Sequence, residues 1–504
     1  MSKPARIIKL TAIDGTPIEF DASEAIGSGA MKDVYFSPDK SYVVAFYRKE
    51  QSTNSRERLE MIVGKFAKQL FGGKGGDNLK NLYCWPTHIV EWEHKGIKKT
   101  GIVAPAYRDN FFFHGGRFDG KEKEGKWFAS PKLRNKMLEP DQKGDWLKYL
   151  LICIKISRAV KKLHAAGLAH SDLSYKNVLV DPLKGDACII DIDGLVVPGK
   201  YPPDVAGTPD FIAPEVLETQ SLSKNDPNKQ VPSILTDRYA LAVLIYMYLL
   251  YRHPLKGRMV CDPNDSGNDE QLCMGKYALF VEHPSDKRNR PDTGRMEPYE
   301  LPQGDVEKYP YTLCGPFLKE LFEKAFIEGL HTPSKRPTAD EWEQALIKTI
   351  DLIQPCQNND CDYKWFPFDN TKKPKCPFCG RKYKGVLPIL NFYYRPRPQD
   401  SFRNEKNKLM VYNGQSLYKW HVDRNVHPNE KIDNKDKKPV GDFHFHNGRW
   451  ILINRSLPDL FDVTDPDDRK HIPVNTSIAL EDGTKILCGR SDSSRLFIVQ
   501  VVKS

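Results

Sequence analysis

The sequence has no apolar run long enough to cross a lipid bilayer. Its longest apolar stretch, Tyr239 to Tyr251, is shorter than the ~20 residues that a membrane-spanning helix requires. The N-terminus also lacks a charged segment followed by an apolar one, which is the pattern of a secretory signal. We therefore expect a soluble, cytoplasmic protein that does not interact with membranes.

The sequence also lacks a concentrated block of charge. Its net charge of +10 is spread over short segments such as residues 98–100, 121–126 and 404–408. Such segments are typical of a solvated surface, so we expect no nucleic-acid partner. With 504 residues, 39% of them hydrophobic and 28% charged, the composition is that of a globular protein of three or four domains and not of a disordered chain.

Three side chains suited to phosphoryl transfer lie between Leu168 and Asp193. They are Asp172, Asn177 and Asp191, which we place at the ends of short strands. A positioned carboxylate can accept the proton of an attacking hydroxyl, while an amide and a second carboxylate can hold Mg²⁺ on the phosphates of a nucleotide. The pattern Asp-x4-Asn, followed by an apolar strand and another Asp, therefore predicts this chemistry.

The same stretch resembles the catalytic segment of the eukaryotic-like protein kinases. Residues 170–177, HSDLSYKN, match the H-R-D-x-x-x-x-N loop, and residues 189–194, IIDIDG, match the strand that carries D-F-G. The resemblance implies that Asp172 orients and deprotonates the acceptor hydroxyl. It also implies that Asn177 and Asp191 bind magnesium.

Two further side chains of this segment have roles by the same resemblance. Lys176 stands four residues after the aspartate, where tyrosine kinases have an arginine, and would supply a cation near the γ-phosphate. Asp193 could add a second oxygen ligand or only cap the turn. The spacing of Asp191 from Asn177 favours Asp191 as the main metal carboxylate.

A glycine-rich turn in residues 26–35, IGSGAMKDVY, predicts a hairpin over the nucleotide. Gly27 and Gly29 would let the backbone come close to the phosphates. By resemblance, Val34 and Ala45 on the flanking strands would also contribute to the nucleotide site.

The lysine of the family's V-A-I-K motif is absent, because residues 44–47 read VAFY and place Tyr47 there. Lys32 stands at the third glycine of the turn, as in the with-no-lysine kinases. From the neighbouring strand its ammonium can reach the same cleft. We therefore predict Lys32 as the ATP lysine, in preference to Arg48 and Lys49, which lie beyond the matching position.

Two more parts of the nucleotide site follow from the resemblance. Apolar residues recur on one face of residues 55–72, which predicts the kinase αC helix. Its acidic partner for Lys32 would be Glu60 or Glu57, and periodicity leaves the choice open. Residues 101–107, GIVAPAY, resemble the last strand of the N-lobe and the hinge. Adenine would bind the hinge backbone, which comprises Val103, Ala104 and Ala106.

The kinase resemblance continues through the activation segment. Ser171 replaces the arginine that grips a phosphate on this segment, so ordering by phosphorylation is not expected. The hydroxyls between Asp191 and Glu215 are Tyr201 and Thr208, and Thr208 stands where serine/threonine kinases contact the catalytic aspartate. We therefore predict phosphorylation of Ser or Thr without a need for a phosphorylated activation loop.

Three scaffold residues favour a protein substrate over a small molecule. Asp237 stands where the family accepts N–H bonds from the catalytic loop, and Arg336 is expected to pair with Glu215 of the A-P-E motif. Aminoglycoside-type kinases generally lack this set.

Four of the eleven cysteines fall within a short window. Cys356, Cys361, Cys376 and Cys379 have the spacing C-x4-C-x14-C-x2-C. This spacing suits four thiolates around Zn²⁺, with no open position for a substrate, so the metal would be structural. The other reading is four free thiols.

The chain after Gly385 has the alternating pattern of an all-β sandwich. Asn447-Gly448 predicts a hairpin between residues 443–446 and 450–453, and residues 481–483 predict a second hairpin between 477–480 and 485–488. The order of these elements is similar to forkhead-associated domains, which bind phosphothreonine. Their Gly-Arg and Ser-x-x-His ligand set is absent here.

Together these features predict a multidomain α+β protein. We expect a bilobal protein kinase fold, with an N-lobe at 1–105 and a C-lobe at 106–353, then a four-cysteine zinc ribbon at 354–384 and a β-sandwich at 385–504. The combination resembles bacterial kinases of tellurite-resistance and stress operons, which pair with a phosphatase and a von Willebrand A-type protein. The predicted function is an ATP- and Mg-dependent protein Ser/Thr kinase. Its alternative is a pseudokinase scaffold or adaptor that binds nucleotide and partners.

Overall fold

The computed structural model describes residues 5–28, 31–94, 96–197, 207–223, 225–368, 374–397 and 399–503. The chain forms two units. Unit 1 comprises residues 1–143, 151–306 and 322–343, and unit 2 comprises residues 144–150, 307–321 and 344–504. The boundaries proposed above at 105, 353 and 384 stay predictions. Within the described ranges, no helix combines the length and apolar character needed to cross a membrane.

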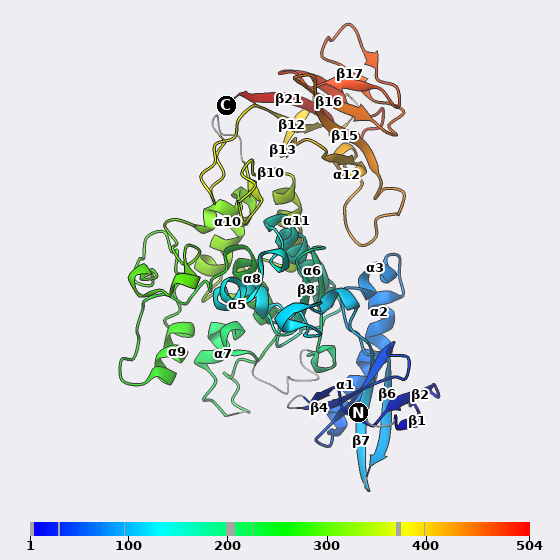
Figure 1. The fold of residues 1–504 in the computed structure, drawn as a ribbon, viewed down its shortest axis with the longest axis vertical. Coiled ribbons are helices and arrows are strands. Elements are labelled where there is room, and N and C mark those ends of the chain that lie inside the picture. The colour runs from blue at the N-terminus through cyan, green and yellow to red at the C-terminus, as the bar shows by residue number, and fades with distance from the viewer. Residues whose placement is uncertain are drawn as a thin grey trace. The chain divides into compact units, whose positions relative to one another are not determined.

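Unit 1 begins with an antiparallel sheet in the order β3-β4-β5-β7-β6, preceded by the hairpin β1–β2 (Figure 1). Neighbouring side chains of a strand point to opposite faces. On β5, Val44 and Phe46 therefore enter an aromatic core with Phe20 and Trp92, while Ala45 and Tyr47 pack on the other face. The strands are β1 (Ile7–Thr11), β2 (Pro17–Asp21), β3 (Gly27–Ser28), β4 (Lys32–Phe36), β5 (Tyr42–Tyr47), β6 (His88–His94) and β7 (Ile97–Pro105).

The predicted helix at 55–72 is present and packs on this second face of the sheet. It starts at α1 (Thr53–Met61), where the Ser52 hydroxyl caps the N-terminus, and continues through a π-helical turn into α2 (Ala67–Phe71). Leu59 of α1 joins Ala45 and Tyr47 in one cluster. The helix therefore buries the face that carries Arg58 and Leu59. A short helix, α3 (Gly76–Lys80), follows.

The helical part of unit 1 is organised around α8 (Ile234–Leu250). This helix is apolar on nearly all sides and buried, as expected of a central core helix. Ser233 and Thr236 form a capping box at its start. The hairpin β8 (Val178–Asp181) and β9 (Asp186–Ile189) follows α6. The other described helices between residues 126 and 350 are α4 (Lys126–Ala129), α5 (Pro131–Met137), α6 (Trp146–Ala165), α7 (Pro214–Glu218), α9 (Ser266–Met274), α10 (Pro316–Glu323) and α11 (Ala339–Ile350).

Two features of unit 1 lie outside the sequence expectations. Residues 108–144 bury an aromatic cluster that includes Phe113, Phe118 and Phe128. Cys273 of α9 forms a disulfide with Cys261. These two cysteines belong to the seven that are scattered outside the Cys356–Cys379 window.

The short hairpin of β10 (Ile353–Pro355) and β11 (Trp365–Pro367) precedes two larger sheets of unit 2, which share one apolar core. The six-stranded sheet has the order β13-β12-β21-β20-β17-β18, and the four-stranded sheet has the order β14-β15-β16-β19 (Figure 1). Phe392 and Phe497 from the first sheet pack with Phe443 and Leu452 from the second. The elements are β12 (Val386–Tyr394), β13 (Arg403–Met410), β14 (Ser416–Tyr418), α12 (Lys419–Val422), β15 (Pro439–His446), β16 (Arg449–Asn454), β17 (Phe461–Asp462), β18 (Lys470–His471), β19 (Ser477–Ala479), β20 (Lys485–Leu487) and β21 (Leu496–Lys503).

One of the two predicted hairpins is confirmed and the other is wrong. β15 pairs with β16 around Asn447 and Gly448, both with positive φ. β19 and β20, however, do not pair with each other. β19 pairs with β16 in one sheet, whereas β20 pairs with β21 and β17 in the other. A short Asp-Gly turn therefore carries the chain from one sheet to the next, which its residues alone do not distinguish from a hairpin.

Candidate active site

The loop between α6 and β8 is fixed in place by one buried carboxylate. Asp237 of α8 is 2% exposed and accepts hydrogen bonds from the backbone N–H groups of His170 (2.7 Å) and Ser171 (3.2 Å). The ring Nε2 of His164 lies 3.1 Å from the same carboxylate. A buried carboxylate with several donors holds its partners firmly. Asp237 thus has the scaffold contact expected from the sequence.

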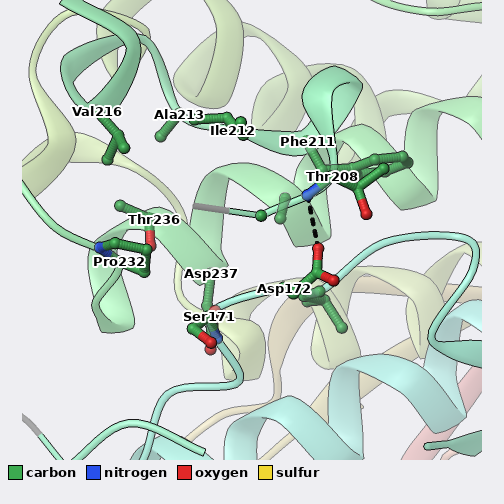
Figure 2. Close-up of a pocket in the computed structure, with 13 residues that line it drawn as sticks. Ser171, Asp172, Thr208, Phe211, Ile212, Ala213, Val216, Pro232, Thr236 and Asp237 are labelled. Atoms are coloured by element: carbon green, nitrogen blue, oxygen red, sulfur yellow. Dashed lines mark hydrogen bonds between the residues drawn. The ribbon is translucent and has the colours of Figure 1, made fainter. Parts of the chain in front are cut away.

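Asp172 stands on this loop with both carboxylate oxygens engaged. Oδ1 accepts a hydrogen bond from the backbone N–H of Thr208 (2.7 Å), which Figure 2 shows as a dashed line. Oδ2 accepts one from the side-chain amide of Asn177 (2.9 Å), which also donates to the Asp172 carbonyl (2.8 Å). The hydroxyl of Thr208 donates to Ser174 (3.2 Å) instead. The Thr208 contact with Asp172 is therefore made through the backbone.

Lys32 lines a small cavity and contacts two aspartates that follow β9. Its ammonium lies 2.7 Å and 2.8 Å from the two carboxylate oxygens of Asp193, and 3.1 Å from Oδ1 of Asp191. Asp172 lines the same cavity. The structure thus brings together the candidate base, the candidate lysine and the candidate metal carboxylates.

The electrostatics of this cluster stabilise its charged forms. Burial lowers the pKa of Lys32, but the two carboxylates outweigh it and raise the pKa above its ordinary value. Burial raises the pKa of Asp193, yet the neighbouring ammonium more than offsets this and the pKa is lowered. Lys32 therefore carries a positive charge and Asp193 a negative one at neutral pH.

Tyr47 is a functional neighbour that sequence reasoning treated only as a departure from V-A-I-K. Its hydroxyl donates a hydrogen bond to Asp193, and the Lys32 ammonium lies 5.5 Å from its ring centroid. Burial, followed by the charge of Asp193, raises the pKa of Tyr47 well above its ordinary value, so the hydroxyl keeps its proton. Lys32 and Tyr47 are paired across β4 and β5. A correct strand register would therefore have predicted that Tyr47 lies beside Lys32.

The structure does not bring the predicted acidic partner on the αC helix to Lys32. Glu60 and Glu57 are both exposed on α1, because Arg58 and Leu59 occupy the buried face. Arg58 lines the cavity together with Lys32. The carboxylates that meet Lys32 come from the segment after β9.

The backbone groups predicted to bind adenine are engaged within the protein. The carbonyl of Val103 accepts from the Thr87 N–H (2.7 Å), and the N–H of Ala106 donates to Ser41 (3.1 Å). Ala104 pairs with Val43 in the β5–β7 ladder. The β7 strand extends to Pro105, so Val103 and Ala104 lie within the sheet, and the adenine assignment at Val103–Ala106 stays a prediction.

The other predicted residues lie as follows. Val34 and Ala45 pair across β4 and β5 and pack together in one cluster. Lys176 is exposed on the catalytic loop. Gly27 lies in β3, paired with Val34, whereas Gly29 and Tyr201 fall outside the described residues.

The A-P-E segment is joined to the rest of the helical part by a buried ion pair. Arg336 is 2% exposed and donates to both carboxylate oxygens of Glu215, at 2.8 Å and 2.7 Å. Such two-pronged pairing fixes the orientation of both groups. The predicted Arg336–Glu215 pair is therefore present.

The four cysteines of unit 2 gather in one place. All four Sγ atoms lie within 4.8 Å of one another. Cys356 and Cys379 are 3.5 Å apart, and Cys361 and Cys376 are 3.9 Å apart. Zinc–thiolate bonds of about 2.3 Å in a tetrahedron place sulfur atoms roughly 3.8 Å apart. The donor set therefore fits a zinc ion held by four thiolates.

Aromatic side chains pack beside this thiol cluster. The rings of Tyr363 and Phe378 are stacked at 3.8 Å, and the Tyr309 hydroxyl donates to the Phe378 carbonyl (2.8 Å). Phe378 also contacts the ring of Trp146, at the start of α6. The cysteine segment is thus packed into unit 2 and is not an isolated finger.

Comparison with known proteins agrees with this geometry. Residues 134–345 match the family model described as the protein kinase domain. This part of the chain is therefore similar to a protein kinase domain. The matched range includes Asp172, Asn177 and Asp191 and extends past Arg336, while the glycine turn with Lys32 lies before it. The match thus covers most of the helical part of unit 1 and does not include its N-terminal sheet.

The similar curated proteins are protein kinases that match over short segments. The chain is 35% identical over 109 residues to a death-associated protein kinase related protein of Drosophila melanogaster, covering 20% of this chain and 14% of that protein. It is 35% identical over 107 residues to death-associated protein kinase dapk-1 of Caenorhabditis elegans, covering 20% and 7%. It is 28% identical over 152 residues to serine/threonine-protein kinase PknD of Chlamydia abortus, covering 25% and 15%.

The chain therefore matches less than one sixth of the length of each of these relatives. A solved structure, the rhoptry antigen kinase domain of Toxoplasma gondii, aligns with a TM-score of 0.41 and 14% identity over 68% of this chain and 86% of that one. A score at this level carries no argument. The family match and the relatives support the predicted enzyme class, protein serine/threonine kinase. Activity, substrates and partners of the whole chain are proposals.

Proposed function

We propose that this protein is an ATP-dependent kinase that transfers the γ-phosphate to Ser or Thr hydroxyls of a protein partner. One observation carries the proposal. A carboxylate held by two hydrogen bonds, Asp172, lines the same small cavity as a partly buried lysine and two further carboxylates. Positioning and electrostatic stabilisation account for most of the catalysis of phosphoryl transfer, and this cavity supplies groups for both.

Each residue of the cavity has a role in this proposal. Asp172 would orient the acceptor hydroxyl and take its proton. The amide hydrogens of Asn177 donate to Asp172, so its carbonyl oxygen is the atom that would meet magnesium, together with Asp191. A bound magnesium ion would neutralise phosphate charge. The carboxylates already hold an ammonium between them, so their environment suits a cation.

The acceptor class is supported by two features. The Ser/Thr kinase names belong to the relatives, and Thr208 contacts the catalytic carboxylate in this chain. Beside Asp172 lies a small pocket with apolar walls from Phe211, Ile212 and Val216 (Figure 2). Ser171 lies where the phosphate-gripping arginine would stand, so we propose that activity does not depend on a phosphorylated activation loop.

The C-terminal half completes the proposal. The four thiols would hold a structural zinc ion, and the two-sheet domain resembles a forkhead-associated domain, without its ligand set. By architecture we place the protein among cytoplasmic kinases of bacterial stress signalling, with a phosphatase and a von Willebrand A-type protein as candidate partners. Deletion of these partners in the same operon and comparison of phosphorylation would test this placement.

The direct test is transfer of radiolabelled phosphate from ATP to protein. Loss of a general base and its positioning typically costs about 10²- to 10⁴-fold in rate, and we expect a loss in this range for Asp172→Asn. Asp77→Asn is the control, because Asp77 is an exposed carboxylate of α3 that pairs only with its neighbour Lys80 among the described ion pairs. Equal transfer by wild type and Asp172→Asn would overturn the proposal.

The second candidate is a pseudokinase scaffold, and specific contacts favour it. The backbone groups first expected to bind adenine are used in the sheet, and Lys32 lies on the carboxylates that would hold metal. Calorimetric titration with ATP separates the two candidates. Binding without transfer, unchanged by Asp172→Asn, would favour the scaffold.

A further inference from the structure

The two aspartates of residues 191–193, which we call the D-I-D segment, have different surroundings. The side chain of Asp193 is 7% exposed and makes two short contacts with the Lys32 ammonium, whereas Asp191 is 49% exposed and makes one longer contact. The backbone of Asp191 is also in the left-handed region, with φ of 60°, which turns the chain between the two side chains. Asp193 is therefore the principal partner of Lys32, and Asp191 faces the open part of the cavity.

Asp193 is in turn held by Tyr47. The tyrosine is 6% exposed, and its hydroxyl donates to Oδ2 of Asp193, the oxygen that also accepts from Lys32 at 2.7 Å. Its ring lies beside the same ammonium. Lys32 and Tyr47 face each other across paired strands. Lys32, Tyr47 and Asp193 therefore form one cluster of contacting side chains at the edge of the cavity.

Among the described residues, helix α1 supplies no carboxylate to the cluster of Lys32, Tyr47 and Asp193. Among the described residues that line the cavity, α1 contributes Arg58, whereas Glu57 and Glu60 are exposed. A cation at this position would repel Lys32 and attract the carboxylate of Asp193. The sign of the charge that the helix presents to Lys32 is thus opposite to that of the expected helix glutamate.

We propose that Asp193 and Tyr47 are positioning residues that aim Lys32 at the phosphates of the nucleotide. This inference rests on the proposed kinase function. In it, the D-I-D segment divides two tasks between neighbouring carboxylates. Asp191 faces the metal, and Asp193 replaces the helix glutamate as the partner of Lys32. The orientation of Lys32 then depends on the sheet and the segment after β9, and not on an acidic side chain of α1.

A double-mutant cycle in the full-length protein tests this division. Tyr47→Phe and Asp193→Asn each remove a hydrogen bond to a charged group, which costs about ten- to a hundredfold. We expect each to lower kcat/KM for ATP by this amount. Because Tyr47 acts through Asp193, the double variant should be no worse than Asp193→Asn alone.

The matched control is Tyr42→Phe. It removes a hydroxyl from the same strand, but that hydroxyl donates to the backbone of Glu19, away from the cavity. We expect unchanged kcat/KM for ATP. If Asp193→Asn folds poorly, as judged by its melting temperature, Tyr47→Phe still tests the inference, because it keeps the ring and its packing.

Magnesium dependence separates the two aspartates. Asp191→Asn should raise the magnesium concentration needed for half-maximal turnover by about tenfold or more, whereas Asp193→Asn should leave it near the wild-type value. An equal shift for both variants, with additive effects of Tyr47→Phe, would make Asp193 a metal ligand and overturn the inference. If wild type transfers no phosphate, the kinase proposal fails by itself. The same cycle in ATP affinity, measured by calorimetry, then decides the inference.

Discussion

The two sides of the candidate active site are held by contacts of different range. On the loop side, Asn177 and Asp172 are 5 residues apart in sequence, and Thr208 and Asp172 are 36 apart. On the strand side, Tyr47 and Lys32 meet Asp193 across 146 and 161 residues. The loop side is thus largely a property of one stretch of chain, whereas the strand side exists only once the sheet has packed against that stretch.

This difference explains why the partner of Lys32 can come from different elements, whereas the partners of Asp172 cannot. A short loop with a fixed spacing offers its polar groups few alternatives, so Asp172 and Asn177 meet whenever the loop forms. A lysine that arrives from another sheet can take its counter-charge from any element that reaches the cavity. Here the segment after β9 supplies it and helix α1 does not. Charge balance is therefore retained while the residue that provides it changes.

The thiol cluster of unit 2 resembles the loop side in the short range of its contacts, because all four cysteines lie within residues 356–379. We expect the purified protein to hold one zinc ion per chain, and Cys376→Ser to lose it. Structural zinc contributes folding free energy directly. The loss should destabilise unit 2 by about 3 kcal/mol or more, which corresponds to a fall in Tm of roughly 10 °C. Elemental analysis and scanning calorimetry measure the two quantities.

Cys488→Ala is the control for this prediction. Cys488 is a buried thiol of the same unit, in the core between the two sheets. Its replacement should cost only packing, about 1 kcal/mol, and leave the zinc content unchanged. A wild-type protein without zinc, whose melting temperature does not respond to chelators, would contradict the assignment.

The parts of the site that were predictable from sequence are those fixed by local spacing. Asp172, Asn177 and the four cysteines meet as their spacing indicates. The Asp237 and Arg336 contacts were also predictable, because the family motifs that carry them are present. The partner of Lys32 was not, because it depends on which face of α1 is buried. Glu57, Arg58 and Glu60 lie on adjoining positions of one helix, and the apolar periodicity does not decide among them.

The wrong hairpin prediction has the same physical origin. The turn at residues 481–483 was taken for a hairpin because its residues suit a reversal of the chain. Whether the next strand pairs with its neighbour or crosses to another sheet is set by the packing of the whole sandwich.

The contacts of the strand side predict that Lys32, and not Lys49, is the lysine that meets the phosphates. Lys32→Met should lower kcat/KM for ATP by about a hundredfold, because a partly buried cation next to the phosphates is lost. Lys49→Met should change it by less than about twofold, since Lys49 is exposed and lies beyond β5. Kinetics at saturating magnesium provide the comparison. A larger effect at Lys49 than at Lys32 would show that another lysine takes the phosphate role.

The smallest effects are expected for the glutamates of α1, and they test whether Asp193 has replaced the helix glutamate as the partner of Lys32. Glu60→Gln and Glu57→Gln remove exposed carboxylates of α1, and exposed substitutions usually change stability by less than about 0.5 kcal/mol. Because Lys32 takes its counter-charge from Asp193, neither variant should alter kcat/KM for ATP by more than about twofold, whereas Asp193→Asn should. A strong loss with Glu60→Gln would mean that α1 rotates in the working enzyme and brings its acid to Lys32. The strand side would then have two arrangements of charge, and the contact with Asp193 would belong to the state without nucleotide.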